Sequence, residues 1–236
     1  MQMKNKQMKP TVSCFVVVFV SAALLMVPAV EAKKREKEVP KVTHDGLELV
    51  LDSKADAIWV RPGADFSGYD RIQILDCYVA FKKYWAQRHN RDSVTKVTNR
   101  DVEHMKAEMA ELFREVFVEV LDTEGGYPVV DEADDDVLVL RPGIIDLDVT
   151  APDTQSQGRS YSFAASAGSA TLYLEIFDSV SGEILARVID HLAASDRGGV
   201  MRWTNRVANR QAAQEVLGKW AEGLRNRLDE VHGQAD

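Results

Sequence analysis

The sequence predicts an α+β fold, with a largely antiparallel sheet and two main amphipathic helices packed on one face as a two-layer sandwich. Three observations predict it. Two segments carry apolar residues at helical spacing, six shorter segments have the composition of strands, and the last two of these are joined by a short turn. Strands connected by turns pair in antiparallel fashion and can leave one face of their sheet uncovered, which the helices would then cover.

The N-terminus has the features of an export signal. Lys4, Lys6 and Lys9 precede an uncharged stretch from Pro10 to Val30, and the small residue Ala32 follows. This order is typical of a secretory signal peptide, so we predict that residues 1–32 are one and that the protein is periplasmic. An uncleaved anchor is the alternative, because a stretch of this length can span a bilayer core of about 30 Å.

The remaining chain is acidic. The whole sequence has 29 Lys and Arg and 37 Asp and Glu; removing residues 1–32 takes away three Lys and one Glu, and leaves a net charge of −10. This charge argues against binding of nucleic acids or anionic lipids, which depends on Lys and Arg. Lys33, Lys34 and Arg35 are the exception. Beside Glu36 and Glu38 they fit a solvated, flexible leader over residues 33–45, although near a membrane they could make a peripheral contact with lipid headgroups.

Residues 46–232 are predicted to form a single domain, followed by a tail over residues 233–236. The domain is long enough for a sizeable hydrophobic core without a disulfide or a metal. Signal cleavage would leave Cys77 as the only thiol, and its apolar neighbours in the sequence predict a buried, unreactive side chain.

Six strands are predicted from short apolar or alternating segments between turn residues. They cover Ile58–Val60, Ile72–Phe81, Tyr127–Val130, Val137–Thr150, Ser169–Phe177 and Ile184–Ala194. Pro142-Gly143 is expected to interrupt the fourth strand, because proline cannot donate a hydrogen bond to a neighbouring strand and glycine tolerates a bulge.

The last two strands flank the turn from Asp178 to Glu183, which fixes their pairing. If Leu174 and Val188 lie on the same buried face, odd-numbered residues of one strand must pair with odd-numbered residues of the other, and even with even. This register predicts that Glu175 lies opposite Arg187 and that Thr171 lies opposite His191.

The first helix is predicted between a capping pair formed by Thr98 and Asp101 and a stop at Gly125-Gly126. Its apolar stripe comprises Val102, Met105, Met109, Leu112, Phe113, Val116, Phe117 and Val120. We expect Met105 and Met109 to fill the core rather than to bind a metal. The second helix is predicted over residues 205–232, with an apolar stripe of Ala213, Val216, Trp220, Leu224, Leu228 and Val231.

Several short motifs together resemble one bacterial envelope family. They are Trp59-Val60-Arg61-Pro62-Gly63, Ser67-Gly68-Tyr69, Gly125-Gly126-Tyr127-Pro128-Val129-Val130, Arg141-Pro142 with Asp146-Leu147-Asp148-Val149, and Asp178 with Ser181-Gly182-Glu183. In order and spacing they resemble the family catalogued as domain of unknown function 3313, over roughly residues 46–229. The resemblance implies an exported α+β domain, often lipid-anchored, with no established activity and no catalytic residues. The chain departs from the lipoprotein pattern because Cys14 opens the apolar stretch instead of closing it.

Two carboxylates are the main candidates for chemistry. Asp146 and Asp148 lie two residues apart on a predicted strand, so both face the same side and could hold a cation or act as an acid and a base. An outward polar face gives the same pattern. It is the simpler interpretation, because no His, Cys or further carboxylate follows or precedes them at a spacing typical of metal ligands. The acidic cluster Asp131–Asp136 could similarly attract calcium, but it lacks the central glycine of an EF-hand loop and fits a solvated turn.

The loops are better candidates for a function in binding. The connection from Ala151 to Gly168 is long, and Arg159 and Tyr161 within it are residue types that often anchor interfaces. A second connection carries Arg197, Arg202 and Trp203, although the simpler interpretation is that Trp203 packs over the end of the sheet and Arg202 stays in solvent. We therefore expect a non-enzymatic envelope protein that binds another envelope protein or a wall or membrane component, without a cofactor or a metal. The alternative is a hydrolase or a divalent-metal-dependent enzyme that uses Asp146, Asp148 and His191, which requires these side chains to converge in a cleft.

Overall fold

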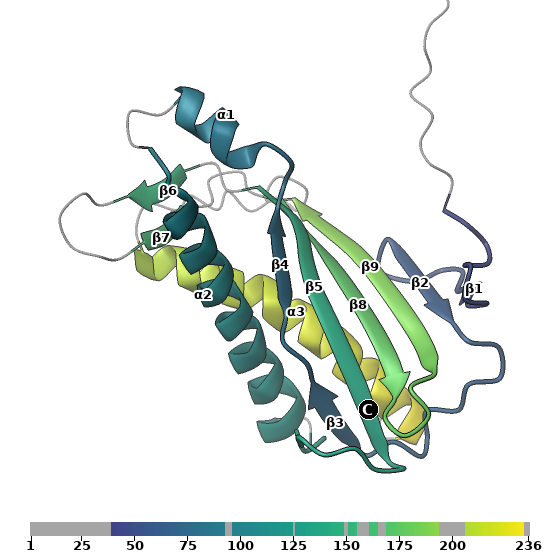
Figure 1. Ribbon diagram of the computed structural model, residues 1–236. Coiled ribbons are helices and arrows are strands. Elements are labelled where there is room, and N and C mark those ends of the chain that lie inside the picture. The colour runs from purple at the N-terminus through teal and green to yellow at the C-terminus, as the bar shows by residue number, and fades with distance from the viewer. Residues whose placement is uncertain are drawn as a thin grey trace, which may run out of the picture. The chain divides into compact units, whose positions relative to one another are not determined.

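A seven-stranded open sheet forms the centre of the domain, with helices packed against it (Figure 1). The computed structural model describes residues 39–92, 96–124, 126–148, 151–154, 161–164, 169–193 and 206–233. Residues 39–236 form one compact unit, separate from residues 1–38. The predicted signal peptide and Lys33, Lys34 and Arg35 lie outside the described residues. In the described part of the chain no helix is both long enough and apolar enough to cross a membrane.

The strands follow the order β1, β2, β9, β8, β5 and β3, and β4 pairs with β5 beyond the end of β3. Their bounds are β1 Glu48–Leu49, β2 Ala57–Val60, β3 Arg71–Ile74, β4 Tyr78–Phe81, β5 Val137–Asp148, β8 Ser169–Asp178 and β9 Ile184–Ala193. The helices are α1 Trp85–Asp92, α2 Asn99–Val118, the π-helical turn η1 Glu119–Thr123, and α3 Arg206–His232. All neighbours pair in antiparallel fashion except β3 and β4, which are parallel to β5. The α+β class and the largely antiparallel sheet are thus confirmed.

One edge of the sheet differs from the prediction. The prediction of a single strand over Ile72–Phe81 is wrong, because this segment forms two strands, β3 and β4, separated by a gap. Pro142 does not interrupt β5, because it pairs with Leu174 within the ladder. The backbone N–H of Leu75, just after β3, donates to Leu140 O, so the backbone groups of Leu140 face β3. Alternate residues of a strand direct their backbone groups to the same side, so the nitrogen of Pro142 faces the gap between β3 and β4. No strand lies beside Pro142 on that side, so the N–H that proline lacks is not needed for pairing.

The irregularity in β5 lies further along the strand. The register with β8 shifts between Ile145 and Asp148, and Asp146 within this bulge has φ 51°. The predicted strand over Tyr127–Val130 is reduced to one parallel bridge between Ile72 and Val129.

Helix α2 follows the prediction closely. The Thr98 hydroxyl accepts the N–H of Asp101, while the Asp101 carboxylate accepts the N–H of Thr98, which completes a capping box. All eight predicted apolar positions belong to the main core cluster or pack against it. The helix continues as η1, and Gly126, with φ 76°, follows its end.

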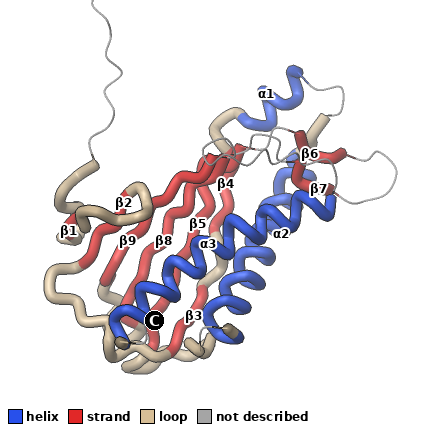
Figure 2. The backbone as a smooth tube through the Cα atoms, turned by 180° about the vertical axis from the view of Figure 1, so that it is seen from behind, coloured by secondary structure: helices blue, strands red, loops and turns tan. Residues whose placement is uncertain are grey.

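The main core lies between the sheet and the helices. It combines Leu138, Leu140, Ile144, Leu172, Leu174 and Ile176 of the sheet with Phe113 and Phe117 of α2 and Leu217, Trp220, Ala221 and Leu228 of α3. Helix α3 lies behind the sheet in Figure 1 and in front of it in Figure 2. Its position is fixed by a hydrogen bond from Trp220 Nε1 to Asp190 Oδ2 of β9, 2.8 Å long. Val231, expected in the buried stripe, is exposed.

The opposite face of the sheet has a smaller core of its own. Leu47, Ala57, Trp59 and Ile184 form it. Part of the segment predicted as a flexible leader contributes here, because Trp59 Nε1 donates to Pro40 O and Asp45 pairs with Arg187. Residues 39–45 therefore belong to the same compact unit as the predicted domain.

Candidate functional site

Three connections leave the sheet at the same end. Since β4, β5 and β9 run in the same direction, α1, the β6–β7 hairpin and the segment before α3 all begin there. The hairpin pairs β6 Ala151–Thr154 with β7 Tyr161–Ala164, outside the main sheet (Figure 1). We call this region, comprising residues 82–92, 146–148, 151–154, 161–164 and 190–193, the loop end.

Among the predicted interaction residues, Tyr161 lies within the described part of the chain, at the loop end. Tyr161 is the first residue of β7 and pairs with Thr154, so the connection predicted as a loop contains a short ladder. β7 lies next to α3 and α2. Arg159, Arg197, Arg202 and Trp203 lie outside the described residues.

The residues of the alternative enzymatic site lie at this end but do not form a cluster. Asp146 is exposed, and Asp148 Oδ2 lies 3.4 Å from Lys82 Nζ. His191 Nδ1 lies 3.0 Å from Thr171 Oγ1, which confirms the predicted pairing of these two residues across β8 and β9. Within the described part of the chain, no hydrogen bond or ion pair joins Asp146, Asp148 and His191. Each of the latter two is bound to a different neighbour.

Helix α1 is an element of the loop end that the sequence did not predict. Trp85, only 3% exposed, stacks on Phe81 with 4.3 Å between ring centroids and on His89 with 5.6 Å. At the other end of the helix, the Asn90 amide donates to Val97 O over 2.8 Å and accepts the N–H of Val97 over 2.7 Å. These contacts fix α1 against the end of β4 and leave the side chains of Gln87, Arg88 and Arg91 exposed to solvent.

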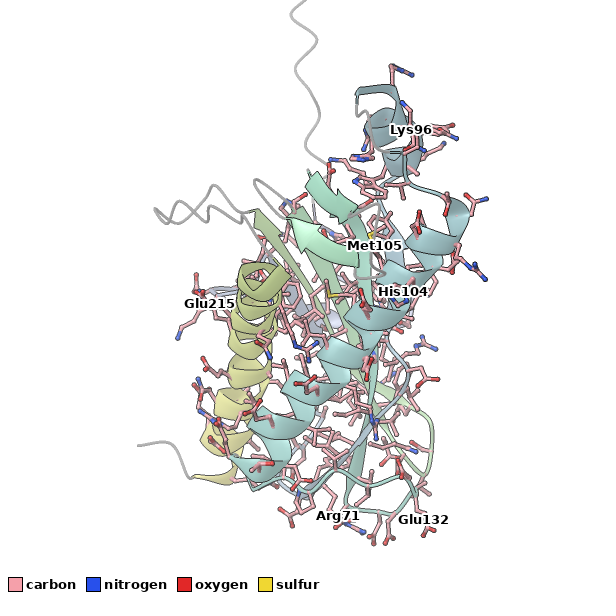
Figure 3. All side chains as sticks on the ribbon, turned by 90° about the vertical axis from the view of Figure 1, so that its left-hand side faces the viewer. Arg71, Lys96, His104, Met105, Glu132 and Glu215 are labelled. Atoms are coloured by element: carbon pink, nitrogen blue, oxygen red, sulfur yellow. The ribbon has the colours of Figure 1, made fainter. Side chains whose placement is uncertain are left out.

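The acidic cluster lies elsewhere. Oxygen atoms of Asp134, Asp135 and Asp136 come within 4.8 Å of one another. However, Arg71 donates from Nε to Asp136 over 2.7 Å and from Nη2 to Asp134 over 2.8 Å. These hydrogen bonds lower the pKa of both carboxyls. Figure 3 shows Arg71 and Glu132 at one end of the domain and Lys96 at the other. The cluster thus has a protein cation as its partner, far from the loop end.

A buried network of charges crosses the face of the sheet opposite the helices. Arg187 donates to Glu175 Oε1 over 2.8 Å and to Asp45 Oδ2 over 2.5 Å. Arg141 Nε and Tyr173 Oη donate to the same Glu175 carboxylate over 2.8 and 2.9 Å. Burial raises the pKa of Glu175, but these hydrogen bonds outweigh it and the net shift is downward. The network is fully satisfied, which fits a structural role.

Three other residues named in the sequence analysis contribute to the hydrophobic core. Met105 and Met109 are buried in it, which confirms that they fill the core. Cys77 is half-buried and packs against the core, and burial raises the pKa of its thiol to about 12. The thiol is therefore protonated at neutral pH and is a poor nucleophile.

Comparison with known families identifies the group to which this protein belongs. Residues 42–224 match the family described as "Protein of unknown function (DUF3313)". The chain belongs to DUF3313. The resemblance expected from the sequence motifs is therefore confirmed, over nearly the range predicted. No curated protein matches this DUF3313 sequence.

Several solved structures are similar to this DUF3313 protein at low sequence identity. Protein XCC0632 from Xanthomonas campestris is 10% identical over 74% of this chain and 91% of its own, with a TM-score of 0.38. The PelC dodecamer from Paraburkholderia phytofirmans is 10% identical over 71% and 96%, with a TM-score of 0.36. A candidate lipoprotein from Caulobacter crescentus is 12% identical over 72% and 97%, with a TM-score of 0.32. None of these similarities assigns a functional residue to the chain.

Proposed function

We propose that this DUF3313 protein is a non-enzymatic binding protein of the periplasm that contacts another envelope component through the loop end. The observation that carries the proposal is the placement of α1 and the β6–β7 hairpin. Both lie outside the main sheet, and both belong to connections that leave it at the same end. Loops presented by a rigid sheet commonly carry binding residues. The predicted export signal at residues 1–32 supports the compartment.

The candidate contacts are Arg159, Tyr161, Arg197, Arg202 and Trp203. Arginine and aromatic side chains are enriched among residues that dominate binding energy at interfaces. The positions of Asp146, Asp148 and His191 give less support to the alternative of a hydrolase or metal-dependent enzyme, because Asp148 and His191 are bound to separate partners. Such an enzyme needs these groups to converge on one reacting atom.

Site-specific photo-crosslinking in intact cells tests the proposal. A photoreactive residue would replace Arg159, Tyr161 or Trp203 in separate variants, and mass spectrometry would identify each adduct. The matched control is Val180, which is 68% exposed in the turn between β8 and β9, at the opposite end of these strands. We expect the same envelope component from the loop-end positions and nothing from Val180. Adducts that form equally from Val180, or from none of the positions, would contradict a binding role for the loop end.

Fractionation of the same cells tests the compartment. Release of the protein by osmotic shock, with residues 1–32 removed, is the expected result. Retention of the protein in the cytoplasm would reject a periplasmic function.

A further inference from the structure

In the part of the chain that the structure describes, positive charge is concentrated around α1. Residues 82–92 contain Lys82, Lys83, Arg88 and Arg91 with Asp92 as the only acidic residue, although the full chain has a net charge of −8. Lys83, Arg88 and Arg91 are exposed. Among the described residues, only Lys82 of these four cations pairs with a carboxylate, that of Asp148. The other three are thus available to an external anion.

An exposed aromatic ring and an apolar hollow lie beside these cations. Tyr84 is 59% exposed, and Lys83 Nζ lies 4.9 Å from the centroid of its ring. A hollow of about 220 Å³ adjoins it, lined by Phe81, Lys82, Tyr84, Trp85, Ala86 and Val102 among others. The surface therefore combines cations, an aromatic ring with a polar tip and apolar side chains within one short segment.

The segment is held in place and does not need to fold on binding. The stacking of Trp85 on Phe81 anchors the start of α1, and the paired hydrogen bonds between Asn90 and Val97 anchor its end. Arg88 Nη1 also donates to Lys83 O over 2.9 Å, so the Arg88 guanidinium is positioned next to the Lys83 backbone. A preformed surface loses little conformational entropy when it binds.

We propose that Lys83, Tyr84, Arg88 and Arg91, the α1 patch, bind the anionic headgroups of a phospholipid membrane. Each Lys or Arg near an anionic membrane strengthens attachment about fivefold, so the three cations together support weak, reversible attachment. A tyrosine beside them suits the interface, where its ring meets the apolar boundary and its hydroxyl meets water. The negative net charge argues against lipid binding by the surface as a whole. It does not argue against binding by one end, because an anionic membrane attracts the end that carries the cations.

Vesicle co-sedimentation tests the proposal directly. The inference rests on the proposed function only because it assumes the same compartment, the periplasm. The assay does not depend on the compartment, since it uses purified protein. Residues 39–236 are used because this unit contains both hydrophobic clusters and excludes the apolar stretch of residues 10–30. The probes are vesicles of phosphatidylglycerol with phosphatidylcholine, and vesicles of phosphatidylcholine alone.

The decisive variant carries Lys83→Gln, Arg88→Gln and Arg91→Gln. The matched control, Lys41→Gln with Lys54→Gln and Lys219→Gln, removes the same charge from exposed positions outside α1. We expect the unsubstituted protein to bind the anionic vesicles and not the neutral ones, with affinity that falls as salt is raised. The α1 variant should lose at least about tenfold in affinity, by the contribution of each cation to membrane attachment, and the control less than about twofold.

Three results would overturn the proposal: no binding to anionic vesicles, equal binding to neutral vesicles, or equal loss in the two variants. A protein adduct from a photoreactive residue at Arg88, together with no vesicle binding, would assign the α1 patch to an acidic protein partner instead. Loop-end crosslinks can succeed or fail independently, so the two proposals remain distinguishable.

Discussion

Glu175 of β8 and Arg187 of β9 lie directly opposite each other, with 2.8 Å between Arg187 Nη2 and Glu175 Oε1. Both side chains are at most 10% exposed. The predicted register of the two strands is therefore confirmed, and it places a buried ion pair on the sheet face opposite the helices. Asp45 and Arg141 extend the pair, so that each buried charge has at least one charged partner.

Replacing Glu175 by Gln should destabilise the protein strongly. The substitution leaves Arg187 buried with only Asp45 as a charged partner, and breaking a buried pair on one side costs about 3 kcal/mol or more. Urea unfolding measures the change. The control is Glu183→Gln, which breaks the more exposed pair with Arg61 and should cost less than about 1 kcal/mol. Equal losses in the two variants would mean that burial adds nothing to the Glu175 pair.

The pair formed by Asp45 and Arg187 should make stability depend on pH in the acidic range. The hydrogen bonds from Arg187 hold the pKa of Asp45 well below its ordinary value of 3.8. A carboxyl with a lowered pKa in the folded state stabilises the protein above its unfolded pKa, and this contribution is lost as the pH falls through the folded pKa. Stability should therefore decline from about pH 5 downward.

Asp45→Asn isolates this contribution. At pH 7 the variant should be less stable than the unsubstituted protein by about 2 kcal/mol, as for a hydrogen bond between charged groups. The difference should shrink as the pH falls below 3.8, the ordinary pKa at which Asp45 gains a proton in the unfolded chain. Urea unfolding at several pH values gives the curve, with Asp76→Asn at an exposed position as the control. A difference that stays constant with pH would show that the Asp45 charge is not responsible.

Tyr84→Gly should stabilise the fold. Tyr84 has φ 62°, in the left-handed region that costs a residue with a Cβ about 1 kcal/mol or more. Glycine removes this strain, but its greater conformational freedom stabilises the unfolded chain. The net gain in the free energy of unfolding should be about 0.5 kcal/mol. The denaturant midpoint reports it. Tyr78→Gly, at an exposed position within β4, should instead lower stability, because glycine weakens strands. A loss at Tyr84 as large as at Tyr78 would refute the strain argument.

The Cys77 thiol should react slowly in the folded protein. Burial raises its pKa to about 12, so almost none of it is thiolate at pH 8. In the unit of residues 39–236, where Cys77 is the only cysteine, an aromatic disulfide reagent should modify it at least about 100-fold faster in concentrated urea, because unfolding restores an ordinary pKa. Equal rates with and without urea would show that the thiol is accessible in the native state.

Local patterns in the sequence account for much of this fold. Helix α2 was predictable because it is long enough to repeat its apolar spacing over several turns, and because Thr98 and Asp101 cap it within three residues. The register of β8 and β9 was predictable because a one-residue slip would move Leu174 and Val188 to opposite faces. In both cases neighbouring residues carry the information.

Features that depend on distant partners were not predictable. The separation of β3 from β4, and the tolerance of Pro142, both depend on which strand lies beside β5. Helix α1 has eight residues, too few to show a period, and its burial is provided partly by Phe81 outside the helix. The buried charge network includes Asp45, which is distant from Glu175 in the sequence, so only the pairing of Glu175 with Arg187 could be predicted.

The two edges of the sheet offer other chains little backbone to pair with. Edge strand β1 has two residues, and the Val129 bridge covers β3 on its outer side, with Val130 N donating to Ile72 O over 2.8 Å. Of the edges described, this leaves β4, with four residues, and the last residues of β9, which extend beyond its pairing with β2. A long open edge is a template for aggregation, and short or covered edges prevent it. These short edges disfavour the joining of two copies sheet to sheet, and they present a partner with side chains rather than with a long open strand.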